Sequence, residues 1–488
     1  MEIELKFRLN AATAKRAVHA LARLPSAGTP AVQKLDALYF DTRNGALRRA
    51  GLTLRVREEG GVFVQTVKRA GALARAEWSD KVSAQTPDRD AGKSGRRLAR
   101  VFKDADDDTL RPRFRVKVTR TTIAILTHGA VIEAAVDIGF IHARSRRLAV
   151  HELELELKSG GTPAALHDLA LDLISRLPLR LEGLSKSDRG YALAAGMFPA
   201  PVDKKPRKKP MRIRGGDTLA ETLRDAGRAF LGQFAANMAA VEDGQAEGVH
   251  QMRVALRRLR GILKAAQDML PSTEYAWVNE RFKHVLQNLG PARNWDVLLE
   301  TLGAAPPTLQ RSAAQRRLVA AAKTRRRAAR RRAVAHVMSP AATKTLLEIG
   351  RWFEGLPRMP ALAVPVKTVA PELLTRAFKR MRKKGRDFAR LIPEERHKLR
   401  IAGKNLRYAA ELFAPLYGAG RVTTFLRRLR AAQDVLGALN DIEGAYALLG
   451  PLALPTAEFV KWLDRKAAGL AKPAARAVEK ARKSRRFW

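Results

Sequence analysis

Charged and apolar residues alternate along several short segments in the first part of the chain. Residues 2–8 read EIELKFR, and residues 152–158 read ELELELK. A period of two sends successive side chains to opposite faces of a strand. Each segment therefore predicts a β-strand with one buried apolar face and one ionised face. The same pattern recurs, wholly or in part, at 54–57, 66–68, 113–117 and 133–137.

The ionised face of any one such strand could simply be a sheet surface in water. Several strands that carry carboxylates and bases together instead favour a cavity in which the two kinds of charge face each other. Carboxylates bind hard divalent cations, and guanidinium groups bind phosphate oxygens. The pattern therefore indicates a site for a divalent cation and a polyanion.

The pattern changes near residue 199. Residues 199–210, PAPVDKKPRKKP, contain four prolines and few apolar side chains, so they predict an extended linker. Beyond Gly216, apolar residues recur at every third or fourth position, which is typical of helices. We therefore expect an α+β domain over 1–198, a basic linker over 199–216 and an all-α domain over 217–488. Helices are expected near 11–24 and 163–177 of the first domain, the second with Thr162 as its N-cap.

The helical part contains an internal repeat. Residues 250–260, HQMRVALRRLR, match residues 397–407, HKLRIAGKNLR, at an offset of 147 residues, and the same offset carries 289–294 onto 436–441. Because both matching segments share one offset, they predict two helical bundles related by approximate two-fold symmetry. The bundles are expected at about 217–345 and 366–488.

Each copy of the repeat places four basic side chains on one stripe of a helix. Positions i, i+3, i+7 and i+10 lie along one face, and like charges there repel one another. A solvated basic face is one interpretation, but its repetition in both copies favours an anion site. A metal site at the histidines is disfavoured because fixed positive charges surround them. The stripes consist of His250, Arg253, Arg257, Arg260 and of His397, Arg400, Lys404, Arg407.

The composition also favours an anionic partner. The chain of 488 residues has 92 Lys and Arg against 48 acidic residues, a formal charge of +44. Such a field attracts nucleic acid, anionic membranes and polyphosphate. Aromatic residues make up only 6% of the chain, which is few for stacking on bases, so nucleic acid is disfavoured as a specific partner.

The sequence predicts a cytoplasmic protein with no membrane insertion. It contains no cysteine, which excludes disulfides and thiolate metal sites. Its first residues do not resemble a signal peptide, and it has no run of eighteen apolar residues. The sequence leaves the oligomeric state open.

The first part resembles the CYTH domain, also called the triphosphate tunnel metalloenzyme domain. Glu2, Glu4 and Lys6 match its ExExK signature, and 54–57, 65–68, 75–77, 113–115, 152–156 and 185–189 follow in the family's order. The resemblance implies a closed barrel of eight antiparallel strands with flanking helices, whose tunnel binds triphosphate with Mg²⁺ or Mn²⁺. The implied metal-side carboxylates are Glu2, Glu4, Glu77, Asp137, Glu152 and Glu154. The implied phosphate contacts are Arg55, Arg57, Lys68, Arg115 and Lys186.

We expect Lys6, Glu4 and Glu154 to act in catalysis. Bases surround Lys6, so it either orients or deprotonates an attacking water or forms one more phosphate contact. One departure from the family concerns metal binding: the second acid that often follows the one at Glu77 is replaced by Ser79.

The helical part resembles the CHAD domain, a histidine-containing module associated with inorganic polyphosphate. The two stripes carry this resemblance together with Arg293, Asp296 and 289–290 in the first copy, and 436–437 and 440–441 in the second. CYTH followed by CHAD is typical of bacterial inorganic triphosphatases. The resemblance implies hydrolysis of tripolyphosphate to pyrophosphate and phosphate, long-chain polyphosphate as a partner, and association with polyphosphate granules.

Two alternatives stay open. Ser79 favours a degenerate tunnel in a non-catalytic protein that binds polyphosphate or associates with granules. The same tunnel could instead act on an organic triphosphate, as in thiamine triphosphatases or CYTH adenylate cyclases.

Overall fold

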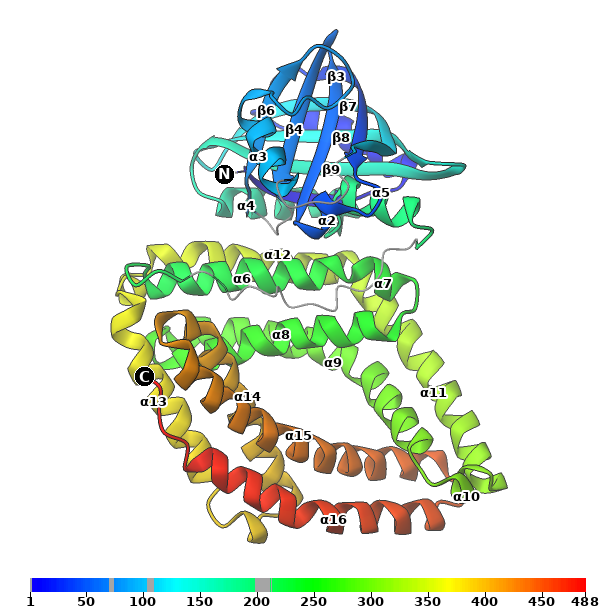
Figure 1. Cartoon of the computed structure of the whole chain (residues 1–488), viewed down its shortest axis with the longest axis vertical. Helices are drawn as coiled ribbons and strands as arrows, with labels where there is room; N and C mark the ends of the chain where they lie inside the picture. The colour runs from blue at the N-terminus through cyan, green and yellow to red at the C-terminus, as the bar shows by residue number, and fades with distance from the viewer. Residues whose placement is uncertain (1, 70–73, 103–108, 198–210, 212) are drawn as a thin grey trace. The chain divides into compact units, whose positions relative to one another are not determined.

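The computed structural model describes every residue except 1, 70–73, 103–108, 198–210 and 212. Most of the expected linker therefore lies outside the described residues. The predicted order, an antiparallel sheet domain followed by a helical region, is confirmed (Figure 1). The chain packs as two compact units. The first is Met1–Asp203 with Leu231–Gly248 and Val337–Glu354, and the second is Lys204–Phe230, Val249–His336 and Gly355–Trp488.

All paired strands of the first unit are antiparallel, in the order β10-β1-β9-β8-β7-β2-β3-β4-β6. The short strand β5 pairs with β1 and leads through Ala76 into β6, so one segment near residue 76 pairs with strands at both ends of this order. Figure 1 shows that the sheet is strongly curled, so that its strands cross one another in this view. The strands are β1 (Glu2–Arg8), β2 (Ala31–Asp41), β3 (Leu52–Glu59), β4 (Val62–Arg69), β5 (Ala74–Arg75), β6 (Glu77–Val82), β7 (Arg111–Thr127), β8 (Ala130–Ala143), β9 (Arg146–Gly160) and β10 (Arg180–Leu181).

Helices flank this sheet, as the sequence predicts. Asn10 caps α1 by accepting a hydrogen bond from the Thr13 backbone N–H at 2.7 Å. The expected cap at Thr162 is wrong by one residue, because Pro163 occupies the cap position of α4. The helices are α1 (Ala11–Ala22), α2 (Ala46–Arg49), α3 (Gly92–Phe102), α4 (Ala164–Ile174) and α5 (Lys186–Ala194).

The alternating pattern of the strands separates an apolar face from a charged one. Leu5 and Phe7 of β1 are buried with Leu153 and Leu155 of β9, in a core that α1 and α4 also supply. Burying these side chains stabilises each strand by about 2 kcal/mol per large apolar residue. The charged residues of β1 and β9 must consequently point to the opposite face.

Helix α5 packs against the inner face of the strands, on β7, β8 and β9. Its Tyr191 meets the ring of Phe114 on β7 edge to face, with the ring centroids 5.1 Å apart. A Cβ on Gly190 would lie 2.2 Å from that ring, so only glycine permits this approach. Ser185 and Asp188 form a capping box that begins the helix.

The remaining helices follow the pattern expected beyond residue 216. Among the described helices, none combines the length and apolar character needed to cross a bilayer. The helices are α6 (Leu219–Ala236), α7 (Met238–Glu242), α8 (Ala246–Ala266), α9 (Ser272–Gly303), α10 (Pro307–Gln310), α11 (Ala313–Val337), α12 (Pro340–Gly355), α13 (Val366–Lys384), α14 (Pro393–Phe413), α15 (Ala419–Leu449) and α16 (Ala457–Arg482).

The helical repeat has a direct structural counterpart. Helices α8 and α14 begin at Ala246 and Pro393, and α9 and α15 begin at Ser272 and Ala419. Both pairs of starts are separated by the 147 residues of the sequence repeat.

Candidate active site

The strand register gathers charged residues on one face of β1, β9, β8 and β7. Lys6 pairs with Glu154, and Arg8 pairs with Glu152. Glu152 pairs in turn with Asp137, and Asp137 with Arg120. Directly opposed residues of neighbouring strands share a face of the sheet. The carboxylates of β8 and β9 therefore share that face with cations of β1 and β7.

The other half of the sheet continues this face. Tyr39 pairs with Arg55, and Thr53 with Lys68. Lys68 then pairs with Glu77 on β6. Tyr39 also opposes Phe114, which lies on the same side of β7 as Arg120. The face thus carries acids mainly on β8 and β9 and bases mainly on β3 and β4.

Three carboxylates form a compact cluster with Lys186 of α5. Lys186 Nζ lies 2.7 Å from Asp137 Oδ2 and 3.0 Å from Glu154 Oε1, and it also contacts Glu152. Asp137 and Glu152 are completely buried. One oxygen from each acid lies within 4.8 Å of the others. Such a set of oxygens fits a hard divalent cation.

Two arginines complete the cluster. Arg120 donates from Nε and Nη2 to the two carboxylate oxygens of Asp137, both at 2.7 Å, and from Nη2 to Glu154 at 2.6 Å. Arg189, one turn into α5, pairs with Glu152. Helix α5 therefore contributes two cations to the acids of β8 and β9.

These contacts decide the protonation of the buried groups. Burial alone would raise the pKa of Glu154, but Lys186, Lys6 and Arg120 outweigh burial and hold its pKa well below the usual range. Lys186 and Arg120 likewise lower the pKa of Asp137 despite burial. Burial would lower the pKa of Lys186, but the two acids raise it. Asp137, Glu154 and Lys186 are therefore ionised at neutral pH.

The opposing bases are Arg55, Arg57 and Lys68. Arg55 is adjacent to Glu77 at 3.9 Å, and its buried Nε atom lacks a hydrogen-bond partner among the described residues. Lys68 Nζ lies 2.6 Å from Glu77, and Arg57 pairs with Glu59 at the end of its strand. Four of the predicted phosphate contacts therefore lie on the inner face: Arg55, Arg57 and Lys68, and also Lys186, which is held by the acids.

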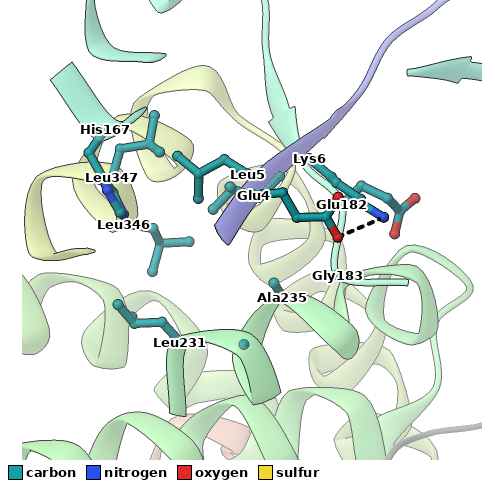
Figure 2. Close-up of a pocket in the computed structure, with 12 residues that line it drawn as sticks. Glu4, Leu5, Lys6, His167, Glu182, Gly183, Leu231, Ala235, Leu346 and Leu347 are labelled. Carbon is teal, nitrogen blue, oxygen red and sulfur yellow. Dashed lines mark ion pairs between the residues drawn. The ribbon is translucent and has the colours of Figure 1, made fainter. Parts of the chain in front are cut away.

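Glu4 and Lys6 line an open cavity in the first unit. Lys6 Nζ is 3.1 Å from Glu4 and 3.3 Å from Glu154. Figure 2 shows Glu4, Lys6 and Glu182 beside this cavity, which is lined elsewhere by leucines such as Leu346. Burial raises the pKa of Glu182. Lys6 thus links this cavity to the acidic cluster.

Three predicted residues lie apart from the cluster. Arg115 is on the opposite face of β7, where Asp36 holds it by two hydrogen bonds of 2.6 and 2.7 Å. Glu77 is held by Lys68 and Arg55 rather than grouped with Asp137. The side chain of Glu2 lies outside the described residues, although its backbone pairs with Arg75.

Sequence reasoning missed three residues of this face: Arg120, Arg189 and Tyr39. Arg120 follows the alternating segment 113–117 but has the opposite phase. Arg189 ends the segment 185–189, in which only Lys186 was given a role. Burial would raise the pKa of Tyr39, but the nearby cations Arg55, Lys68 and Lys186 lower it. The strand pairing of β2 with β3 and of β7 with β8 would have been needed to find Tyr39 and Arg120, and the packing of α5 on the sheet to find Arg189.

The two basic stripes of the helical part meet where α8 and α14 cross. A Cβ on Gly261 would lie 2.7 Å from Tyr408 and 3.0 Å from Asn405. Arg257, one turn before Gly261, therefore lies near Arg400. Desolvation lowers the pKa of Arg257 most, and repulsion by Arg400 lowers it further.

The cluster extends to α9 and α15. Arg293 is paired with Glu300 at 2.8 Å and Arg407 with Glu411 at 3.0 Å, but bases still outnumber acids. Burial, Arg257 and Arg293 lower the pKa of Arg253 to about 9. Asp441 is an acid in this cluster, and burial raises its pKa despite Arg400, Arg293 and Lys404. An enclosed group of like charges suits a polyanion.

The outer members of the stripes make other contacts. His397 is exposed, and its Nδ1 lies 2.7 Å from Asn440 Oδ1. Arg260 donates to Asn279 at 2.7 Å. His250 lies on α8, half-buried. The structure therefore brings together the inner residues, Arg253, Arg257, Arg293, Arg400, Lys404 and Arg407.

Two family models account for both parts. The CYTH domain matches residues 1–191, and the CHAD domain matches residues 225–450. The chain is a CYTH–CHAD protein. The sheet face that carries the acids and the opposing bases falls in the CYTH domain. The basic cluster at the helix crossing falls in the CHAD domain.

Several known proteins are similar to parts of this CYTH–CHAD protein. An uncharacterized protein of Mycobacterium tuberculosis is 28% identical over 320 residues, 61% of this chain and 58% of the relative, so the chain spans less than two thirds of that protein's length. An inorganic triphosphatase of Haemophilus influenzae is 28% identical over 170 residues, 33% of this chain and 46% of the relative. The crystal structure of the CHAD domain of the plant Ricinus communis matches at 26% identity with a TM-score of 0.50, covering 58% of this chain and 98% of that domain.

Proposed function

We propose that the CYTH domain hydrolyses inorganic tripolyphosphate to pyrophosphate and phosphate with Mg²⁺ or Mn²⁺, and that the CHAD domain binds long-chain inorganic polyphosphate. The observation that carries the first part is the opposition of two charged groups on one sheet face: Asp137, Glu152 and Glu154 against Arg55, Arg57 and Lys68. The relative named an inorganic triphosphatase matches a third of the chain and supports the same activity.

The acidic cluster would hold the divalent cation. Asp137, Glu152 and Glu154 supply carboxylate oxygens at the spacing such an ion requires, and Glu4 lies on the adjacent strand. When bound, the ion supplies positive charge that offsets the charge of the phosphoryl oxygens. Lys186 now contacts the same three acids, so it must release at least some of them when the ion binds.

The bases would hold the triphosphate. Arg55, Arg57, Lys68 and Arg120 offer guanidinium and ammonium donors that stabilise phosphoryl oxygens as the terminal P–O–P bond breaks. Water supplies the new P–O bond, and its proton leaves to a base or to solvent. Lys6 is held between Glu4 and Glu154, which suits it to orient that water or to bind a phosphate oxygen.

Phosphate release from tripolyphosphate, ATP and thiamine triphosphate, measured side by side with Mg²⁺ or Mn²⁺, tests this activity. Arg120→Met is expected to lower kcat/KM for tripolyphosphate by about a hundredfold. Arg115→Met on the outer face of the same strand is the matched control and should change it less than about twofold. Equal losses in both variants, or no phosphate release by the wild type, would refute the assignment.

Two alternatives are separated by the same panel. A non-catalytic polyphosphate-binding or granule protein is favoured by Ser79, which leaves β6 with Glu77 and no second inner-face acid at that position. It predicts binding of tripolyphosphate without turnover. Preference for thiamine triphosphate, or conversion of ATP to a cyclic nucleotide, would instead indicate an organic substrate.

The CHAD assignment rests on the basic cluster between the two repeats. Repeated contacts along a uniform polyanion need no reading of bases, so an array of arginines without aromatic platforms suits polyphosphate better than nucleic acid. We expect the protein in the cytoplasm, associated with polyphosphate granules. Competition between polyphosphate and duplex DNA at physiological salt tests the partner.

A further inference from the structure

Lys404 occupies the centre of the crossing between the two repeats. Gly261 and Tyr408, which meet there, are repeat equivalents separated by 147 residues, and so are Arg257 and Lys404 one turn earlier. The approximate symmetry therefore brings one stripe against the other at this point.

The charges around Lys404 are mostly of its own sign. Arg400 and Arg407 flank it on α14, Arg257 reaches it from α8, and Asp441 faces it from α15. Arg407 is itself paired with Glu411, one turn further along α14, at 3.0 Å. Desolvation and the three arginines lower the pKa of Lys404 to about 7, against the opposing effect of Asp441. The ammonium of Lys404 is thus held in a place where a positive charge is costly without an anion.

Unsatisfied donors in the same cluster point independently to an anionic ligand. Arg253 and Arg400 are repeat equivalents, and the Nε atom of each is buried with no hydrogen-bond partner among the described residues. Leaving a buried donor unpaired costs about 1–3 kcal/mol. Arg257, by contrast, is exposed, so the cluster is open to solvent on that side.

We propose that the CHAD domain binds polyphosphate together with a proton that Lys404 takes up from solvent, so that its affinity falls as the pH rises above neutrality. This inference rests on the proposed polyphosphate binding. An anion at the cluster favours the charged form of Lys404 and raises its proton affinity. The affinity is then greatest below the pKa of Lys404 in the unbound protein, and it falls as the pH rises through that pKa.

The first repeat provides the control. Its equivalent residue is Arg257, and an arginine holds its proton more strongly than a lysine in the same place, so it stays mostly protonated throughout this pH range. Lys404→Arg therefore keeps the positive charge and removes the titration, whereas Lys404→Met removes both.

Binding of long-chain inorganic polyphosphate to the full chain, in EDTA and at constant ionic strength, tests the proposal. Between about pH 6 and about pH 8.5, the wild-type affinity should fall about tenfold more than that of Lys404→Arg. Calorimetry near pH 8 in buffers of different ionisation enthalpy should show close to one more proton taken up by the wild type. The tunnel is the same in both proteins, so the difference belongs to the helical site.

The outcomes distinguish a wrong role for Lys404 from a wrong choice of polyphosphate as the ligand. Identical pH profiles and proton uptake in the wild type and Lys404→Arg would overturn the role of Lys404 while leaving polyphosphate binding intact. No binding by the wild type at any pH would overturn the proposed partner itself. Lys404→Met should bind weakly at both pH values; strong binding by this variant would also overturn the inference.

Discussion

Lys186 acts in the folded protein as a built-in counterion. Its ammonium contacts three carboxylates, two of which are completely buried. Buried carboxylates are tolerated only when they are paired, because each loses its hydration. The position of Lys186 is also the position that a divalent cation would need, so the lysine and such an ion would compete for the same oxygens.

Replacing Lys186 with Met should make the fold depend on metal. Without divalent ions, we expect the free energy of unfolding to fall by about 3 kcal/mol, because the acids lose a buried partner. Added Mn²⁺ should then stabilise the variant more than the wild type, since its site is no longer occupied. Denaturant unfolding with and without Mn²⁺ measures both effects.

Lys117→Met provides the control for the loss of one positive charge. Lys117 is 54% exposed on the outer face of β7, where it lies 3.3 Å from Asp36. This variant should unfold at nearly the wild-type denaturant concentration and respond to Mn²⁺ as the wild type does. An equal Mn²⁺ response in the Lys186 variant would show that the lysine and the ion do not share a site.

At the scale of secondary structure, β7 shows what the sequence could and could not predict. Its alternation correctly predicted a strand with two unlike faces. The charged positions 115 and 117 nevertheless point outward, and the apolar Phe114 and Val116 point inward, because Tyr191 of α5 packs on them. Alternation alone does not tell which face is inside, and the insertion of α5 is a long-range packing event.

The strands β1 and β9 were easier to predict, because helices cover their apolar face. Their apolar residues, such as Leu5 and Leu155, pack under α1 and α4, so the charged residues had only the opposite face of the sheet left. In the helices, the repeat predicted which residues are equivalent. It did not predict that His397, at the outer end of its stripe, would form a hydrogen bond with Asn440.

Gly190 should control both the stability of the first unit and its active site. In Gly190→Ala, the added Cβ would approach the Phe114 ring to 2.2 Å, so α5 must shift, at a cost of about 1–3 kcal/mol in the free energy of unfolding. The shift also moves Lys186, so phosphate release from tripolyphosphate should fall. Thermal unfolding and activity are measured together.

Gly444→Ala is the matched helix control. A Cβ at Gly444 of α15 meets nothing within 4 Å. This variant should be neutral or more stable by roughly 1 kcal/mol, because alanine favours helices over glycine, with unchanged activity. If Gly190→Ala behaved like Gly444→Ala, α5 would not be held by close packing on β7.

At the scale of the whole molecule, the charge of +44 raises the question whether polyphosphate is held by one cluster or by the general field. Exposed charges act over about 8 Å at physiological ionic strength before salt screens them. Arg257 and Arg331 are both exposed, but Arg257 adjoins Arg400 and Lys404, whereas Arg331 belongs to a basic run along α11. The two residues therefore separate local from diffuse attraction.

Arg257→Met should lower the affinity for polyphosphate about tenfold at physiological salt, and Arg331→Met less than about twofold, because screening removes most of a distant exposed charge. Arg257→Met should also unfold at an equal or higher temperature than the wild type, since it relieves repulsion among like charges. Binding and thermal unfolding of both variants check this. Equal losses of affinity would assign the polyanion to the general field, and a large loss of stability would mean that the cluster supports the fold rather than a ligand.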